Sequence, residues 1–401
     1  MQIKKVMFVL PCMKGGGAER VAALLANEFH QQGIETSIVL TSTTPLDVVR
    51  IDLKEAVSLK VLSEETGKEN PVGSFWRKFI RLSSSLVCRL FEELCRPVPA
   101  WWAYCSFWSQ YRNEMVQLRA MMQKNPETCV IAFLQPSIPI ILLAARGLRN
   151  RVIISERGDP RRLMKKRYGR KFIEKYYGRA DAAVFQTEDA KNTYPPCVSE
   201  KGVVIPNPIK ADLPAPYQGA RNKNITTFCR ISAQKNLPVL FEAFRMLHQD
   251  YPDYTLRIIG DAVNDEGRRI EAQLKQYVHE HQLEAAVGFE PFKANVHEAI
   301  LEDAMYVNSS DYEGISNAML EAMAIGMPVV CTECPIGGAK ATIFDSENGL
   351  LVPVGDSSAL YRAMKRLIEE PELAQRISRN AAMLRDELTL ESIAKKWMEL
   401  L

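Results

Sequence analysis

The stretch that most constrains the fold of this chain is residues 309–328, because short strand-like runs flank it on both sides, at 304–307 and 329–332. Between those runs, a polar turn containing Gly314 leads into a helix with apolar residues at helical spacing, which Gly326 and the following proline end. A strand–loop–helix–strand unit builds a parallel sheet, and its loop lies at the carboxyl ends of the strands, where ligands bind.

The start of this helix has the chemistry of a ligand site. Ser316 stands at the N-cap position, and a helix start offers unpaired N–H groups and a partial positive charge, which suit phosphate. Two carboxylates bracket it, Glu313 in the loop and Glu321 on the helix, and carboxylate oxygens accept hydrogen bonds from hydroxyl groups. The pattern predicts a ligand that is part phosphate and part polyol. The alternative is an ordinary amphipathic helix with Glu321 facing solvent.

The full string E-G-I-S-N-A-M-L-E-A-M-A-I-G-M-P-V-V, from residue 313, resembles the donor-site signature of family 4 retaining glycosyltransferases. These enzymes have the α/β GT-B architecture of two facing Rossmann-like domains. The resemblance implies that Glu313 holds the hydroxyls of the donor sugar and Glu321 those of the ribose. It also implies that Gly314, Ser316 and Asn317 lie against the donor.

A second phosphate-binding pattern follows the strand-like run 225–229. Arg230 and Lys235 stand five residues apart at the strand end, and Asn236 is placed to cap the helix that follows. This string resembles the family's G-R-x-x-x-x-K-N pyrophosphate clamp, with Cys229 where glycine is usual. The resemblance implies that Arg230 and Lys235, with Glu313, are the catalytic residues. Gly260, at the end of the next strand, is a further donor-binding candidate.

In the first half of the chain, the strand-like run 6–10 leads into a glycine loop that includes Gly16 and Gly17, and a helix follows. Glycines between a strand and a helix let the backbone approach a ligand closely. The loop resembles the first loop of family 4 enzymes, which implies that Gly16 and Gly17 reach the donor. Alone, a glycine loop is a weak signal.

The strand-like run 152–155 ends in a charged loop that contains Glu156, Arg157 and Asp159. It resembles the S-E-R-N-D-P loop of a branch of family 4 that builds surface polysaccharides and lipid-linked oligosaccharides, with Gly158 in place of asparagine. We expect these three residues on the acceptor side, and the alternative is an internal salt bridge. None of the five histidines lies in a loop that matches a family catalytic histidine.

Strands alternate with helices in both halves, which predicts two parallel α/β sheets. We expect an acceptor-binding domain over 1–205, a proline-rich linker over 206–222, and a nucleotide-sugar-binding domain over 223–386. The final helix, 387–401, is predicted to cross back to the first domain, with Trp397 and Leu400 as its anchors.

Charge and aromatic residues suggest a membrane partner. Residues 72–120 contain four of the five tryptophans, interleaved with arginines, and residues 146–179 contain 13 Lys+Arg against 3 Asp+Glu. Such segments suit an anionic membrane surface, although a packed helical excursion and a solvated basic helix explain them as well. The nine cysteines form no regular framework, which favours reduced thiols and a cytoplasmic protein, peripheral on the inner face of the plasma membrane.

The sequence therefore predicts a retaining glycosyltransferase that moves a hexose or N-acetylhexosamine from a UDP-sugar to a lipid-linked glycan. No Asp-x-Asp occurs in the chain, and the cation pair predicts a leaving group that is neutralised without a metal or other cofactor. A nucleotide-sugar epimerase of the same two-domain shape and a non-catalytic sugar-nucleotide-binding protein are the alternatives. Nucleic-acid binding through the basic cluster is a weaker one that we do not expect.

Overall fold

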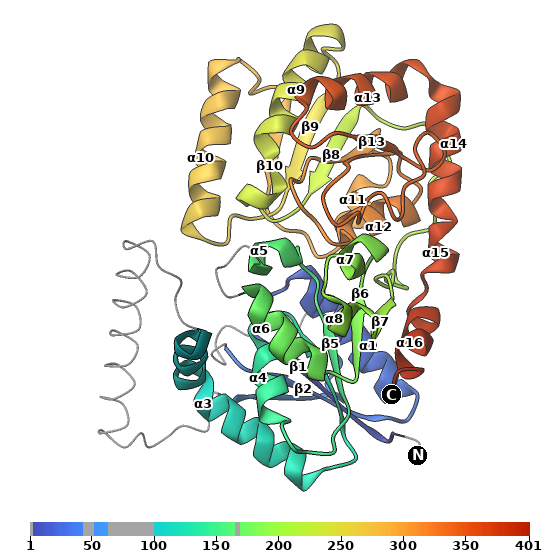
Figure 1. Cartoon of the computed structure of the whole chain (residues 1–401). Helices are drawn as coiled ribbons and strands as arrows, with labels where there is room; N and C mark the ends of the chain where they lie inside the picture. Colours follow the sequence, from blue (N-terminus) through green and yellow to red (C-terminus); the bar gives the residue numbers. More distant parts are fainter. Residues whose placement is uncertain (1–2, 43–51, 63–99, 165–168) are drawn as a thin grey trace. The chain divides into compact units, whose positions relative to one another are not determined.

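The structure is a computed structural model of the whole chain, and it describes residues 3–42, 52–62, 100–164 and 169–401. Backbone contacts divide the chain into two compact units (Figure 1). Unit 1 contains Met1–Ile205 and Ile393–Leu401, and unit 2 contains Pro206–Ser392. The end of the chain therefore belongs to the same unit as its beginning.

Unit 1 is built on a seven-stranded sheet in the order β3-β2-β1-β4-β5-β6-β7, and every neighbouring pair is parallel. Its strands are β1 (Lys5–Leu10), β2 (Glu35–Leu40), β3 (Ser58–Val61), β4 (Cys129–Phe133), β5 (Val152–Ser155), β6 (Ala182–Phe185) and β7 (Gly202–Val204). The strand order reverses between β1 and β4, and in such sheets the crevice at the carboxyl ends of the reversing strands is the usual ligand site.

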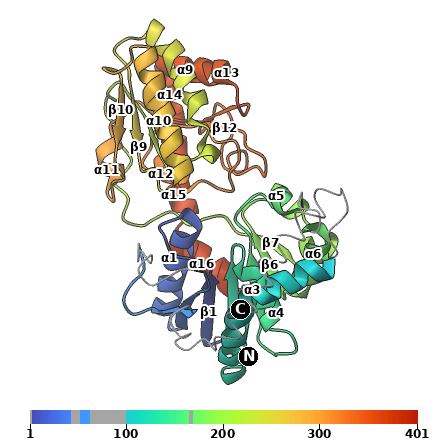
Figure 2. The same ribbon diagram turned by 90° about the vertical axis from the view of Figure 1, so that its left-hand side faces the viewer.

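The helices of unit 1 are α1 (Gly17–Gln31), α3 (Ala100–Lys124), α4 (Ser137–Ala144), α5 (Pro160–Met164), α6 (Gly169–Tyr176), η3 (Tyr177–Arg179), α7 (Glu188–Asn192) and α8 (Pro196–Ser199). The terminal helix α16 (Leu390–Met398) joins them and lies beside α1 in both views (Figures 1 and 2). Trp397 of this helix is fully buried and stacks on Phe133, with ring centroids 5.6 Å apart. The C-terminal helix thus contributes to the core of unit 1.

Unit 2 repeats the same design with six parallel strands in the order β10-β9-β8-β11-β12-β13. Its strands are β8 (Asn224–Phe228), β9 (Thr255–Ile259), β10 (Val287–Glu290), β11 (Met305–Asn308), β12 (Val329–Thr332) and β13 (Leu350–Val352). The order reverses between β8 and β11, so the loops that follow these two strands flank the expected ligand crevice.

The helices of unit 2 are η4 (Ala233–Lys235), α9 (Leu237–Asp250), α10 (Asp265–Glu280), α11 (Val296–Ile300), α12 (Asn317–Ala324), α13 (Ser357–Glu369), α14 (Pro371–Ala382) and α15 (Leu384–Glu387). Two apolar clusters hold them to the sheet. One joins α9, α10, α13 and α14, and the other joins α11 and α12 with the segment that follows β7. Alternate strand residues feed each cluster, as expected for a sheet covered on both faces.

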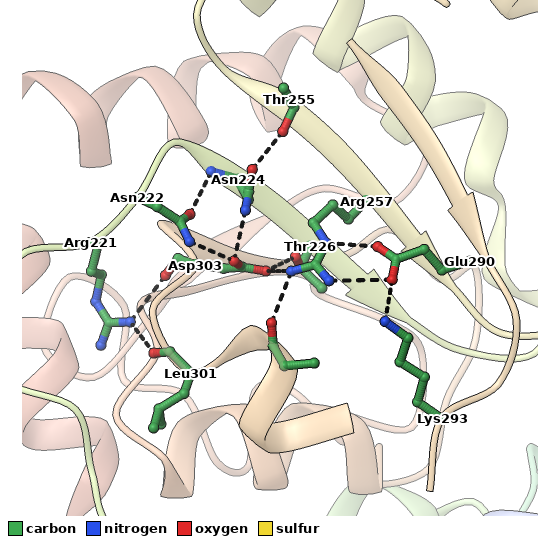
Figure 3. A network of polar contacts seen from close by, with 11 residues as sticks. Arg221, Asn222, Asn224, Thr226, Thr255, Arg257, Glu290, Lys293, Leu301 and Asp303 are labelled. Carbon is green, nitrogen blue, oxygen red and sulfur yellow. Dashed lines mark hydrogen bonds and ion pairs between the residues drawn. The ribbon is translucent and has the colours of Figure 1, made fainter. Parts of the chain in front are cut away.

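A buried acidic residue ties the central strands of unit 2 together. Asp303, whose side chain is 1% exposed, precedes β11 and lies at the centre of Figure 3. It accepts hydrogen bonds from Asn222, Asn224 and Thr226 and pairs with Arg257 of β9, whose Nη1 is 2.7 Å away. A buried carboxylate is stable only when such donors surround it. The network therefore fixes the strands whose far ends carry the candidate site.

These findings confirm the two parallel sheets that the sequence predicted. Strands β2 and β3 were not predicted. Residues 206–222 belong to unit 2, with Ile209 and Leu213 buried in it, although they form no helix or strand. Within the aromatic and basic segment 72–120 expected at a membrane, residues 72–99 lie outside the described residues. None of the described helices has both the length and the apolar character needed to cross a bilayer.

Candidate functional site

The loop after β8 carries the two predicted cations of unit 2 and is bonded to the loop after β11. The backbone N–H of Asp311 donates to the Gln234 carbonyl at 3.0 Å, and the Ser309 hydroxyl donates to the Lys235 carbonyl at 2.9 Å. Arg230 and Lys235 are therefore held at the point where the strand order reverses, which is where a parallel sheet of this kind binds ligands.

Lys235 and Glu313 form a direct ion pair across this crevice, between the Nζ and Oε1 atoms. Both side chains are mostly buried, and the Ser310 hydroxyl donates a further hydrogen bond to Oε1 of Glu313 at 3.1 Å. Burial alone would lower the pKa of Lys235, but the neighbouring carboxylate outweighs burial and raises the pKa above its usual value. The ammonium is thus charged at neutral pH and lies beside a carboxylate.

Arg230 differs from Lys235 because it is exposed. Within the part of unit 2 that the structure describes, its guanidinium makes no hydrogen bond or ion pair with another residue. Its charge acts on the site all the same, since it opposes the protonation of Lys235. The crevice therefore has one cation bound to a carboxylate and a second that is available to an anion from solvent.

The helix start at α12 has the predicted cap. Ser316 is the N-cap residue, and its hydroxyl accepts a hydrogen bond from the backbone N–H of Met319 at 3.4 Å. Asn207 fixes the first turn by donating to the Ile315 carbonyl at 3.1 Å and to Oδ1 of Asn317 at 2.6 Å. The loop and helix that follow β11 are thus held from outside by the segment that precedes β8.

Two glycines permit close backbone contacts around this loop. A Cβ atom at Gly338 would lie 1.5 Å from the carbonyl oxygen of Gly314, so only glycine fits. Gly260 has a φ of +142°, and a Cβ atom there would lie 2.1 Å from the carbonyl oxygen of Cys229. Gly260 therefore lets the end of β9 pack against the loop that carries Arg230.

The second predicted carboxylate, Glu321, is 4% exposed and does not face solvent. Its Oε2 atom lies 2.8 Å from Nε2 of His297, a buried residue of α11. The solvent-facing alternative for Glu321 is thus wrong. His297 was not found from the sequence, because its partner lies 24 positions along the chain on another helix.

The predicted cap at Asn236 is also different. Its side chain makes no cap hydrogen bond to α9 and instead donates to Oδ1 of Asp311 at 2.6 Å. Asn236 has a φ of +41°, in the left-handed region that asparagine tolerates better than most residues. This residue therefore turns the chain from η4 into α9 and bonds the two loops of the crevice to each other.

In unit 1, Gly16 and Gly17 lie at the start of α1, after β1. The buried carboxylate of Glu19 organises this loop by accepting hydrogen bonds from the backbone N–H groups of Gly16, at 2.9 Å, and Lys14. The Cys12 thiol donates to the other oxygen of Glu19 at 3.2 Å. Glu19 was not predicted as a loop-holding residue, although it lies three positions after Gly16.

The predicted acceptor-side residues follow β5 in unit 1 and have different surroundings. Glu156 accepts hydrogen bonds at Oε1 from Gln135, at 2.9 Å, and from the Tyr177 hydroxyl, at 2.8 Å. Burial raises the pKa of Glu156 to about 7, although the Tyr177 hydrogen bond opposes the rise. Arg157 is buried over the rings of Phe133 and Trp397, 4.9 and 5.7 Å from their centroids, and burial lowers its pKa to about 9.

Asp159, the third member of this loop, forms a bidentate pair with Arg161 of α5, with its Oδ2 atom 2.8 Å from Nη2. The loop after β5 thus contains one half-buried acid in a polar cluster, one arginine in the core, and one mostly buried acid paired with an exposed arginine. Of these, Glu156 is the group best placed to exchange a proton with a ligand.

Residues 218–383 match the family model described as Glycosyl transferases group 1. Curated relatives include an uncharacterized glycosyltransferase of Haemophilus influenzae, 27% identical over 45% of this chain and 49% of the relative. The putative colanic acid biosynthesis glycosyltransferase WcaL of Escherichia coli is 31% identical over 51% of this chain and 50% of the relative. This chain spans about half of the length of these relatives.

A third relative, from Campylobacter jejuni, is named N-acetylgalactosamine-N,N'-diacetylbacillosaminyl-diphospho-undecaprenol 4-alpha-N-acetylgalactosaminyltransferase, and it is 28% identical over 38% of this chain and 39% of the relative. Among solved structures, Anabaena Alr3699/HepE in complex with UDP superposes with a TM-score of 0.75 at 17% identity, over 98% of both chains. The same protein with UDP-glucose gives a TM-score of 0.74 at 16% identity, over 98% of both chains. These structures confirm the fold.

Proposed function

We propose that this chain is a retaining glycosyltransferase that uses a UDP-sugar, and the match of residues 218–383 to the model of glycosyl transferases group 1 supports this proposal. The observation that carries this proposal is the group of residues at the carboxyl ends of β8 and β11 in unit 2. There, one buried and one exposed cation, a carboxylate and a capped helix start converge at the reversal of strand order. The structure of Anabaena Alr3699/HepE with UDP-glucose supports the choice of donor.

The catalytic roles follow from the charges. Arg230 and Lys235 would neutralise the diphosphate as it leaves, and preorganised charges act most strongly where charge develops in the transition state. The Lys235 ammonium has three donor hydrogens, so it can bind a phosphate oxygen and keep one bond to Glu313. Neutralisation by two side chains is also the basis for proposing that no metal is required.

Recognition of the donor would use the carboxylates and the helix start. Glu313 would accept hydrogen bonds from the sugar hydroxyls and Glu321 from the ribose. Gly314, Ser316 and Asn317 would present the backbone at the start of α12 to the phosphates. The glycine loop of unit 1, with Gly16 and Gly17, is proposed to contact the donor as well.

We propose a lipid-linked glycan as the acceptor. The name of the Campylobacter jejuni relative specifies a diphospho-undecaprenol substrate, and the name of the Escherichia coli relative specifies colanic acid biosynthesis. Glu156 is the acceptor-side residue that we favour most, since burial raises its pKa to about 7 and it accepts hydrogen bonds from Gln135 and Tyr177. Such an acceptor would place the protein at the inner face of the plasma membrane.

The proposal is tested with purified protein and a panel of UDP-hexoses and UDP-N-acetylhexosamines, with and without a membrane lipid extract, and with EDTA in parallel. We expect one donor to be consumed only when lipid is present, with the anomeric configuration retained and no loss of rate in EDTA. Arg230→Ala and Lys235→Ala should each lower kcat/KM about 100-fold.

Arg268→Ala is the matched control, because Arg268 is an exposed arginine of α10 that pairs with Asp265. Its kcat/KM should equal that of the parent. Turnover by Arg230→Ala and Lys235→Ala at the parental rate would overturn the proposed clamp. Isomerisation of the UDP-sugar without any lipid product would instead favour an epimerase.

A further inference from the structure

We infer that His297 is a positioning residue that orients Glu321 toward the ribose of the donor. The inference rests on the proposed function, since it concerns the nucleotide that Glu321 would bind. His297 Nε2 and Glu321 Oε2 are 2.8 Å apart, and the two residues are 6% and 4% exposed. An ionised carboxylate only accepts hydrogen bonds, so Nε2 carries the hydrogen in this pair.

The hydrogen bond from His297 restricts the terminal torsion of the Glu321 side chain. The terminal torsion of a glutamate side chain has broad preferences, so the carboxylate of Glu321 has little orientation of its own. The bond from His297 fixes Oε2. A carboxylate offers about four acceptor positions, so one carboxylate can accept hydrogen bonds from an imidazole and from ribose hydroxyls at the same time.

The imidazole of His297 is itself held in place. Its ring meets the ring of Phe228 edge to face, with centroids 5.8 Å apart and an interplanar angle of 85°. Phe228 ends β8, two residues before Arg230, and also packs against Tyr306 of β11. Val296 and Ile300, on either side of His297 in α11, are buried in the same cluster. Contacts through His297 and Phe228 therefore hold Glu321 in a fixed position relative to β8, the strand that leads into the proposed diphosphate clamp.

A positioning role and a purely stabilising role predict different results in a binding experiment. If His297 only stabilises unit 2, its loss lowers the affinity for all nucleotides equally. If it orients Glu321, its loss lowers only the affinity for ligands that have ribose hydroxyls. The ratio of the affinities for UDP and 2′,3′-dideoxy-UDP separates the two roles, because the second nucleotide lacks both hydroxyls and keeps the base and the diphosphate.

The experiment measures both affinities by calorimetry for the parent and for His297→Leu, with His297→Asn as a second variant in case the first does not fold. Asparagine is too short to place a donor at the position of Nε2. We expect UDP affinity to fall about 10-fold in each variant, and 2′,3′-dideoxy-UDP affinity to stay within about 2-fold, as for the loss of one hydrogen bond to a charged group. His297→Gln, whose amide reaches the Nε2 position, should retain the parental ratio.

His279→Leu is the matched control. His279 of α10 also pairs with a glutamate at 2.8 Å, Glu284, but its side chain is 85% exposed. This variant should keep both affinities. In turnover, His297→Leu should raise KM for the UDP-sugar and leave kcat within about 2-fold, as for lost uniform binding.

An unchanged ratio in both His297→Leu and His297→Asn, with UDP still binding to the parent, would overturn this inference and leave the proposed function standing. A parent protein that binds neither UDP nor any UDP-sugar would overturn the proposed function, and the role of His297 with it.

Discussion

Glu156 and Lys235 are both ionisable side chains withdrawn from water, and their neighbours shift the two pKa values for opposite reasons. The Glu313 carboxylate more than compensates the burial of Lys235, so this lysine keeps its charge. No cation among the described residues compensates the burial of Glu156, and its pKa rises to about 7. One site is thus suited to hold a charge on a diphosphate, and the other to gain or lose a proton near neutral pH.

The raised pKa of Glu156 predicts a pH-dependent stability for unit 1. The folded chain keeps the Glu156 proton up to about pH 7, whereas the unfolded chain loses it near its ordinary value of 4.5. The folded state therefore binds more protons between these pH values, and the free energy of unfolding falls as the pH rises through them. The side chain in Glu156→Gln cannot ionise, so the free energy of unfolding of this variant should fall less than that of the parent. The difference between the two should be at most about 3 kcal/mol over this pH range.

Urea unfolding at pH 5, 6, 7 and 8, followed by tryptophan fluorescence, measures this difference, because all five tryptophans lie within the residues of unit 1. Glu200→Gln, at an exposed position of the same unit, is the control and should follow the parent at every pH. Parallel pH profiles for the parent and Glu156→Gln would show that Glu156 titrates normally.

Among single residues, the sequence predicted those whose place beside an expected strand or helix already indicates a ligand. Arg230, Lys235 and Glu313 stand at strand ends or helix starts, where the spacing itself indicates a ligand. His297 has no such signal, because a histidine on a short helix is usually a core or surface residue. Its partner becomes visible only when the fold brings α11 against α12. Gln135 and Tyr177, which surround Glu156, were missed for the same reason.

The positions of the loops of unit 2 depend on close contacts between backbone atoms of different loops. One such contact is between Gly338, in the loop after β12, and the carbonyl of Gly314, beside Glu313. We predict that Gly338→Ala displaces one of these loops, because its Cβ atom would lie 1.5 Å from that oxygen. UDP affinity should fall at least about 10-fold, since a clash of this kind cannot be relieved by rotating a side chain.

Gly288→Ala is the matched control for this element. Gly288 lies in β10 of the same sheet, and nothing lies within 4 Å of a Cβ atom built there. Calorimetry with UDP should give the parental affinity for Gly288→Ala. Parental affinity in Gly338→Ala as well would mean that the two loops are not coupled as described.

Elements with a strong periodic pattern were predicted well, and elements without one were missed. The strands β1, β4 and β12 consist mostly of apolar residues, and α9 has a clear apolar face. By contrast, β2 begins with Glu35, Thr36 and Ser37, and polar residues in a strand weaken its signal. Its identity depends on pairing with β1, which a local pattern does not contain.

At the scale of the whole molecule, the division into two sheets followed from the alternation of strands and helices. The role of the C-terminal residues is a matter of packing. Trp397 is fully buried, stacks on Phe133 and lies under the Arg157 guanidinium. The sequence suggested Trp397 as an anchor, but its two partners in unit 1 could not be identified before the fold was known.

We predict that Trp397→Ala destabilises unit 1 by about 3–5 kcal/mol, as expected for the loss of a buried aromatic side chain. The remaining four tryptophans still report on this unit. In urea unfolding followed by fluorescence, the midpoint for Trp397→Ala should lie at a clearly lower urea concentration than that of the parent. The midpoint for Trp397→Phe should lie between the two.

Lys396→Ala is the control, because Lys396 is exposed and precedes Trp397 on the same helix. Its midpoint should match that of the parent. An unchanged midpoint in Trp397→Ala would mean that the C-terminal helix is not required for the stability of unit 1.

The discontinuous composition of unit 1 has a consequence during translation. Pro206–Ser392 is an uninterrupted segment, so unit 2 can fold cotranslationally, without waiting for residues that follow Ser392. Unit 1 lacks Ile393–Leu401 until all of unit 2 has been synthesised, and the surface that packs against Trp397 stays uncovered until then. The half that is made first is therefore the half that matures last.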